Sequence, residues 1–321
     1  MQEHNLHIDY NNLHNEKSAV IVQSAILRSL IYFDLFNYPL TEAEIVQYSG
    51  VHLTNLSQVE GALETLTESL MVFRFGEFYS LKNDASLAQR RIKGNRSAAE
   101  VMPKAMRRSQ FIQKFPFVRS VNISGSLSKN YFDETTDFDF FIITSPGRIW
   151  IARILLTFYK KLFLLNNRKY FCINYYISSD ELEIPDQNLF SATEIITLKN
   201  HTGEIFYKQF IESNAWVKLH FPNFIPDYYH MEAPQKQFLK KRIENLLKGK
   251  FGDRLDDIAC RITLRFLKKR YTHLSADEFK VNMRTKKNAS KHHPQGFQFK
   301  VLKAFDEKCL DFEVTHQFKL I

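Results

Sequence analysis

"SGSLSKNYFDETTDFDFF", residues 124–141, places a Gly-Ser pair ahead of an acidic turn, followed by two aspartates one residue apart at the start of an apolar run. Side chains alternate along a β-strand, so Asp137 and Asp139 should share one side while Phe138 points to the other, into the core. Two carboxylates about 7 Å apart along one strand repel each other unless a cation lies near them. Oxygen ligands of this kind suit Mg²⁺, so the aspartates predict a metal site.

The Gly-Ser pair predicts an anion site beside this metal. Gly125 has no side chain, so a phosphate can approach its backbone, and Ser126 offers both a hydroxyl and an N–H group. Lys129, three residues further on, is placed to reach a β- or γ-phosphate. Adjoining cation and anion sites indicate metal-assisted phosphoryl or nucleotidyl transfer, in which positioning and charge neutralisation supply most of the catalysis.

The same stretch resembles the signature of the DNA polymerase beta-like nucleotidyltransferase superfamily: Gly-Ser, about ten residues, then Asp-x-Asp on a strand. The resemblance covers roughly residues 100–200. It implies that Asp137 and Asp139 bind two Mg²⁺ ions, or Mn²⁺ in their place, and that Gly125 and Ser126 hold the triphosphate of an NTP. An acceptor would then attack the α-phosphate and release pyrophosphate.

A third carboxylate usually accompanies such a site on a nearby strand, where it binds a metal and takes up the acceptor's proton. In "FCINYYI", residues 171–177, the polar residue at that place is Asn174, which lacks both charge and basicity. Three explanations remain open. Another acid substitutes for it (Asp180, Glu181 or Glu194), a single metal suffices, or the site binds nucleotide without turnover.

The N-terminal part predicts a small helical module. Residues 18–36 have the apolar spacing of a buried helix, and Thr41 with Glu44 matches a capping box, as does Ser57 with Glu60. "MVFRFGEFYSL", residues 71–81, predicts a hairpin turning at Gly76. Three helices followed by a hairpin resemble a winged helix. Its third helix would present Glu60, Glu64 and Glu68 on one face, which disfavours DNA binding by that helix.

The remaining chain alternates predicted helices and strands. We expect a basic helix over 85–114, kinked or divided at Pro103, strands over 117–124, 137–144 and 169–178, and mainly helices after them. Residues 283–299 lack any period and predict a basic loop. The fold class is therefore α/β (α+β), a nucleotidyltransferase-like mixed sheet flanked by helices. The predicted parts are a winged-helix-like module at 18–84, a nucleotidyltransferase-like domain at 85–230 and a basic, mainly helical region at 231–321.

The charge distribution bears on partners. The net charge is +9, and residues 231–321 carry 21 Lys and Arg against 11 Asp and Glu, so the basic excess lies in the C-terminal third. Such a region can attract nucleic acid, although a solvated helical face has the same composition. No run is long and apolar enough to predict a membrane span, and the polar N-terminus and three scattered cysteines predict a cytoplasmic protein without membrane contact.

These patterns and the resemblance together lead us to expect a Mg²⁺-dependent nucleotidyltransferase that moves an NMP from an NTP to an acceptor, which the resemblance implies is a small molecule, a protein or RNA. The alternative is a catalytically weak or inactive nucleotide-binding regulator that binds nucleic acid or a protein partner. Asp137, Asp139 and Asn174 are the predicted catalytic positions, the two aspartates are the metal ligands, and Gly125, Ser126 and Lys129 bind the phosphates.

Overall fold

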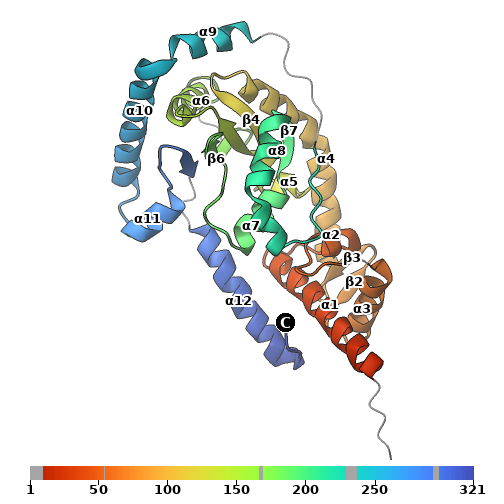
Figure 1. Cartoon of the computed structure of the whole chain (residues 1–321). Helices are drawn as coiled ribbons and strands as arrows, with labels where there is room; N and C mark the ends of the chain where they lie inside the picture. Colours follow the sequence, from red (N-terminus) through yellow and green to blue (C-terminus); the bar gives the residue numbers. More distant parts are fainter. Residues whose placement is uncertain (1–9, 54, 166–168, 229–236, 292–295) are drawn as a thin grey trace, which may run out of the picture. The chain divides into compact units, whose positions relative to one another are not determined.

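The computed structural model describes residues 10–53, 55–165, 169–228, 237–291 and 296–321 (Figure 1). Its described residues form a mixed α/β chain with twelve α-helices and two sheets, as the sequence predicts. The chain divides into two compact units. Unit 1 combines residues 1–91, 218–224 and 301–321, and unit 2 combines residues 92–217 and 225–300. Residues 225–300 thus fall in unit 2 and residues 301–321 in unit 1.

Unit 1 begins with the predicted helices and hairpin. Its three-stranded sheet has the order β1-β3-β2, and β2 and β3 are antiparallel strands joined at Gly76, whose φ is +64°. A turn with positive φ favours glycine, so the predicted hairpin is confirmed. Its elements are α1 (Tyr10–Asp34), β1 (Leu40–Thr41), α2 (Glu42–Gln47), α3 (Leu56–Glu68), β2 (Phe73–Phe75) and β3 (Phe78–Ser80).

Helix caps in unit 1 confirm one prediction and correct another. The Thr41 hydroxyl accepts a hydrogen bond from the Glu44 N–H at 3.3 Å, and the Glu44 carboxylate accepts one from the Thr41 N–H at 3.0 Å. The second predicted capping box, Ser57 with Glu60, is wrong. Helix α3 begins two residues earlier than that box requires, and its cap is Asn55, whose side chain accepts from the Ser57 N–H. The cap of α3 therefore does not involve Glu60. The side chains of Glu60, Glu64 and Glu68 are exposed.

The last residues of the chain complete unit 1. Phe305, on the final helix, packs edge-on against Tyr32 of α1 with ring centroids 5.8 Å apart. Lys308 forms an ion pair with the buried Asp34. The Ile321 N–H donates to the Ser24 hydroxyl at 2.6 Å. Residues 301–321 are therefore part of the same packed unit as α1.

Unit 2 is built on a five-stranded sheet in the order β7-β4-β5-β6-β8, in which only the β5–β6 pair is parallel among the pairs described. Three of its strands lie where the sequence predicts them. Strands β7 and β8 were not predicted, and the expectation of a loop over 283–299 is wrong because β8 lies within it. The strands are β4 (Val118–Ser124), β5 (Asp139–Thr144), β6 (Cys172–Ser178), β7 (Lys199–Thr202) and β8 (Ala289–Lys291).

Helices account for most of the remaining chain. Helix α4 runs without interruption through Pro103, so the predicted division there is wrong. The helices that follow α3 are α4 (Ala85–Gln113), α5 (Gly125–Ser128), α6 (Ile149–Phe163), α7 (Leu189–Ile196), α8 (Glu204–Ser213), a 3₁₀ helix (Ala215–Leu219), α9 (Phe238–Leu246), α10 (Gly249–Arg270), α11 (Ala276–Asn282) and α12 (Phe297–His316).

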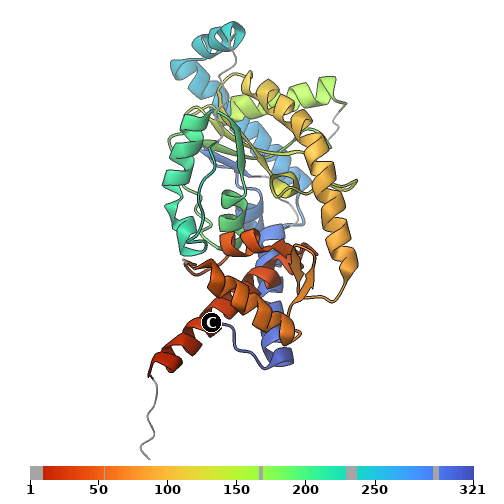
Figure 2. The same ribbon diagram turned by 90° about the vertical axis from the view of Figure 1, so that its right-hand side faces the viewer.

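Helices cover both faces of the five-stranded sheet. On one face Phe140 and Ile142 of β5 join a buried cluster with Ala105 of α4, Trp150 of α6 and Ala259 of α10. On the other face Phe141 packs against Phe210 of α8, with ring centroids 4.9 Å apart. Figure 2 shows α4 and α8 on opposite sides of this sheet. The odd-numbered side chains of β5, including Asp139, therefore belong to the α8 face.

Asp256 ties α10 to the first turn of α6. Its carboxylate accepts the Ile151 N–H at 2.9 Å, where the N-cap residue Arg148 makes no side-chain cap. Burial raises the pKa of Asp256 to about 6, although backbone N–H bonds and Arg148 act to lower it. The folded chain thus holds the proton more tightly than the unfolded chain, so this group's stabilisation is greatest below about pH 4 and is lost as the pH rises towards 6.

We expect Asp256→Asn to flatten this dependence. Between pH 4 and pH 7 the wild-type chain should lose about 2 kcal/mol more unfolding free energy than the variant does. Urea denaturation at both pH values measures the difference. Asp257→Asn, at the more exposed neighbouring carboxylate, is the control and should track the wild type.

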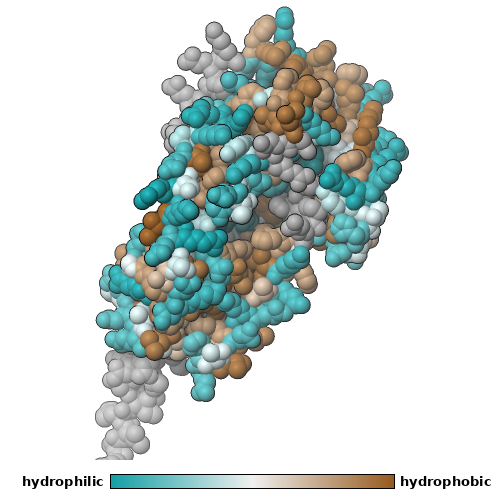
Figure 3. Space-filling model, turned by 180° about the vertical axis from the view of Figure 1, so that it is seen from behind, coloured by the Kyte–Doolittle hydropathy of each residue, from teal (hydrophilic) through white to brown (hydrophobic). Residues whose placement is uncertain are grey.

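Hydrophobic side chains gather on the solvent side of α6 and α10, and Figure 3 shows them as a brown area over these helices. On α10, Phe251, Ile258, Ile262 and Phe266 recur at helical spacing beside a row of exposed arginines. On each helix the exposed apolar side chains occupy one side, and charged side chains lie next to them. Within the described residues, no helix has the length and apolar content that crossing a bilayer requires.

Candidate active site

Strand pairing brings the two halves of the opening motif together. Asp139 is the first residue of β5 and pairs with Ser124, the last residue of β4, directly before Gly125. On its other side Asp139 pairs with Cys172, the first residue of β6. Asp137 precedes the strand, although the sequence predicted that the strand would include it. Phe138 is buried between Phe132 and Tyr170, as the predicted alternation requires.

A cluster of three potential metal ligands lies at this edge of the sheet. Asp137, Asp139 and Cys172 each offer one ligand atom, and these atoms all lie within 4.8 Å of one another. The three side chains are partly buried. The sequence did not single out Cys172. The available signal was its spacing, because a residue two positions before Asn174 lies on the same face of the strand.

The charge of Asp139 is unfavourable in this environment. Burial, and then the neighbouring Asp137, raise the pKa of Asp139 to about 8, with a smaller contribution from Glu194. Burial and the nearby Asp139 likewise raise the pKa of the Cys172 thiol well above its usual range. Without a cation Asp139 and Cys172 therefore tend to retain their protons near neutral pH, and a bound cation would favour the charged carboxylate of Asp139.

Asn174 orients Asp139. The Asn174 amide donates a hydrogen bond of 2.5 Å to Oδ1 of Asp139, and its oxygen accepts one from the Cys172 thiol at 3.1 Å. The pairing of β5 with β6 skips Asn174, because Ile173 pairs with Phe140 and Tyr175 with Phe141. Asn174 is thus the unpaired residue at this irregularity, and its side chain lies on the same face as Cys172. The predicted third position therefore contacts Asp139 through its NH₂ group.

Gly125 is required by the position of Asp139. Its φ is +67°, in the left-handed region, and a Cβ added there would lie 2.4 Å from Oδ2 of Asp139. The close approach predicted for this glycine is thus made by a carboxylate. Gly125 also begins α5, a single turn that contains Ser126 and ends beside Lys129.

Lys129 reaches back over the Gly-Ser turn. Its ammonium group donates to the Gly125 carbonyl at 3.3 Å and to Glu194 of α7 at 2.8 Å. Glu194 is thereby held near the aspartates, where it contributes to the raised pKa of Asp139. Its position beside the site could not be read from the sequence, since Glu194 comes 55 residues after Asp139.

Two of the proposed substitutes for a third acid lie elsewhere. Asp180 and Glu181 follow the end of β6, whereas Cys172 and the cluster lie at its start. A strand of this length spans about 20 Å, so neither carboxylate reaches the cluster. Of the three acids considered, Glu194 is the one that the structure places beside the site.

The donor set is compatible with a hard divalent cation. Two carboxylates on one side of a sheet edge are suitable ligands for Mg²⁺ or Mn²⁺, whereas the thiol is a softer donor that Mg²⁺ does not prefer. Asn174 would supply an oxygen ligand if its amide rotated. The aspartates are therefore the residues that would hold the metal.

Comparisons of the chain with protein-family models, with curated proteins and with solved structures find no significant match.

Proposed function

We propose that this protein is a Mg²⁺-dependent nucleotidyltransferase that moves an NMP from an NTP to an acceptor and releases pyrophosphate. The observation that carries the proposal is the pairing of Ser124 with Asp139, which sets Gly125 and Ser126 directly beside the two aspartates. A metal-binding pair and a phosphate-binding turn at one sheet edge are the two requirements of this chemistry.

The roles of the residues follow from their positions. Asp137 and Asp139 would hold the metal, which, when bound, neutralises phosphate charge. The Gly125–Ser126 turn would receive the triphosphate, and Lys129 would contribute its positive charge there. Asn174 keeps the Asp139 carboxylate aimed at the site through its 2.5 Å hydrogen bond. Glu194 is the acid that we propose to receive the acceptor's proton, because it lies nearest the cluster among the substitutes considered.

The proposal also covers the two parts of the chain, the cellular location and the acceptor. We propose that the part of the chain around the five-stranded sheet is a nucleotidyltransferase-like domain and that residues 18–84 are a winged-helix-like module. The exposed glutamates of α3 support a partner-binding role for this module instead of DNA binding by that helix. We also propose that the protein acts in the cytoplasm and that its basic C-terminal region favours an anionic acceptor such as RNA.

A second function is favoured by one observation. Asn174 stands where a third carboxylate is expected, and it donates to Asp139 instead of offering a negative charge. A site with this substitution fits a regulator that binds an NTP with Mg²⁺ and does not turn it over.

Pyrophosphate release distinguishes the two functions. The wild-type chain is incubated with each NTP and Mg²⁺, with water alone, amino sugars and amino alcohols, denatured protein, or RNA with a free 3′ end as acceptor. The transferase should release pyrophosphate with one acceptor class, and the release should require Mg²⁺. Saturable Mg²⁺-dependent NTP binding without release in any arm would instead support the regulator.

A further inference from the structure

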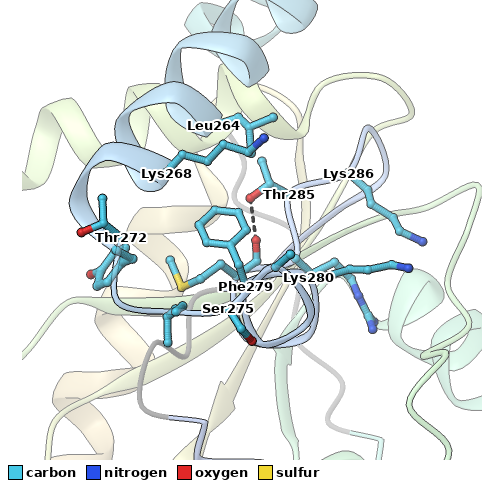
Figure 4. Close-up of a pocket in the computed structure, with 13 residues that line it drawn as sticks. Leu264, Lys268, Thr272, Ser275, Phe279, Lys280, Thr285 and Lys286 are labelled. Atoms are coloured by element: carbon cyan, nitrogen blue, oxygen red, sulfur yellow. Dashed lines mark hydrogen bonds between the residues drawn. The ribbon is translucent and has the colours of Figure 1, made fainter.

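A hollow lies at the end of α10. It has a volume of about 520 Å³ and is lined by the last turns of α10, the connection 271–275, α11 and residues 283–286. This volume is within the range of small-molecule sites. Figure 4 shows the Phe279 ring in its centre, with Lys268 on one side and Lys280 and Lys286 extending together on another.

The hollow carries positive charge. Lys268, Lys280 and Lys286 line it, and none of them forms an ion pair within the part of the chain that the structure describes. Arg284 also lines it but is paired with Asp186 at 2.8 Å. No Asp or Glu is among the lining residues. Three uncompensated ammonium groups around one space favour an anion.

The same hollow has an apolar and aromatic wall. Leu264, Tyr271, Phe279 and Met283 line it together with the lysines. Met283 is fully buried and Phe279 is partly exposed, so the ring is accessible from the hollow. Flat aromatic rings beside cations suit a ligand with a planar π-system and phosphate groups, because the ring stacks and the ammonium groups bind the phosphates.

This hollow is separate from the Asp137–Asp139 cluster. The carbonyl of Lys286 accepts the Trp150 indole N–H at 3.1 Å, at the start of α6 and beyond the C-terminal end of β5. Strand β8, which follows residue 286, pairs with the last residues of β6. The cluster lies at the opposite ends of β5 and β6, about 20 Å away along the strands.

We propose that this hollow binds a nucleoside phosphate, with its base against Phe279 and Tyr271 and its phosphates between Lys268, Lys280 and Lys286. The ligand is either a free nucleotide or the terminal nucleotide of an RNA strand, since both present the same chemistry. This site does not require Mg²⁺ or the aspartates, so it stands independently of the transferase activity proposed above.

The test uses the full chain carrying Asp137→Asn and Asp139→Asn, in EDTA, so that the first site does not contribute. Calorimetry measures binding of ADP, of a 5′-phosphorylated five-nucleotide RNA and of inorganic phosphate. We expect saturable binding of ADP or RNA and at least tenfold weaker binding of phosphate. Tighter binding of RNA than of ADP identifies a strand end as the ligand, and the reverse identifies a free nucleotide.

Two variants locate the binding. Adding Lys280→Ala and Lys286→Ala should weaken it at least tenfold, whereas the control pair Lys241→Ala and Lys248→Ala, which removes equal charge from exposed positions outside the hollow, should change it less than twofold. Phe279→Leu should weaken ADP binding and leave phosphate binding unchanged. Absence of binding, equal losses in both lysine pairs, or equal affinity for phosphate and ADP would each overturn the proposal.

Discussion

Asp139→Asn is expected to weaken Mg²⁺-dependent NTP binding by about 100-fold or more, since a metal held by one fewer carboxylate loses several kcal/mol of its interaction with the phosphates. Calorimetric titration of each NTP, with Mg²⁺ and without it, measures the effect. The wild-type chain should bind one NTP in a Mg²⁺-dependent manner. The double variant Asp137→Asn and Asp139→Asn should retain only the Mg²⁺-independent part.

The stability of Asp139→Asn should change in the opposite direction. The pKa of Asp139 in the folded chain is about 8, above its ordinary value, so ionising this buried carboxylate destabilises the fold as the pH rises from about 4 to 8. Asparagine keeps the acceptor for Asn174 and removes the charge. At pH 8.5 the variant should therefore be at least as stable as the wild type while failing to bind.

Glu134→Gln removes an exposed carboxylate from the same loop and serves as the control. It should leave both NTP binding and stability unchanged. If Asp139→Asn bound NTP and Mg²⁺ as the wild type does, the aspartates would not be the metal site.

Gly125→Ala is the second substitution with a large expected effect. The added methyl would lie 2.4 Å from Oδ2 of Asp139 and 3.1 Å from its Cγ, so the carboxylate must rotate away from the cluster. We expect Mg²⁺-dependent NTP binding to fall about as far as in Asp139→Asn. Stability should fall by about 1–2 kcal/mol, because alanine disfavours the left-handed backbone.

Gly147→Ala separates the effect of the contact with Asp139 from the effect of the left-handed backbone. Gly147 has φ +60°, in the same region as Gly125, but nothing lies within 4 Å of an added Cβ. It should show the backbone cost, measured by urea denaturation, with normal NTP binding. Equal NTP affinities in the two alanine variants would show that the contact with Asp139 does not matter for the site.

The correct predictions came from patterns among residues that are close together in the sequence. The capping box at Thr41 and Glu44, the hairpin at Gly76 and the burial of Phe138 each depend on residues within a few positions of one another, so the sequence contains the whole interaction. The capping error at Ser57 has the same origin. Asn55 and Ser57, two positions apart, could each cap α3, and Asn55 is the one whose side chain accepts from a free N–H group.

The features that the sequence did not predict depend on contacts between residues far apart in the chain. Strands β7 and β8 are short, and each is defined by a partner strand far away in the chain, with Lys199 pairing with Ile123 and Ala289 with Ile177. The location of Glu194 beside Asp139 depends in the same way on where α7 packs. The Asp-x-Asp spacing placed two carboxylates, but it could not reveal that Cys172 begins the adjacent strand.

The composition of unit 1 has a consequence for how the chain folds during synthesis. Its first 91 residues leave the ribosome before unit 2 is made, and among them Lys82 pairs with Asp34. Phe305 and Lys308, which contact Tyr32 and Asp34 respectively, follow unit 2 in the chain. Until residues 301–321 are synthesised, the face of α1 that carries Tyr32 and Asp34 lacks its contacts with Phe305 and Lys308, and all of unit 2 is made during that time. Residues 301–321 thus pack with the N-terminal helices in one unit, and cutting the gene after residue 84 would remove part of that unit.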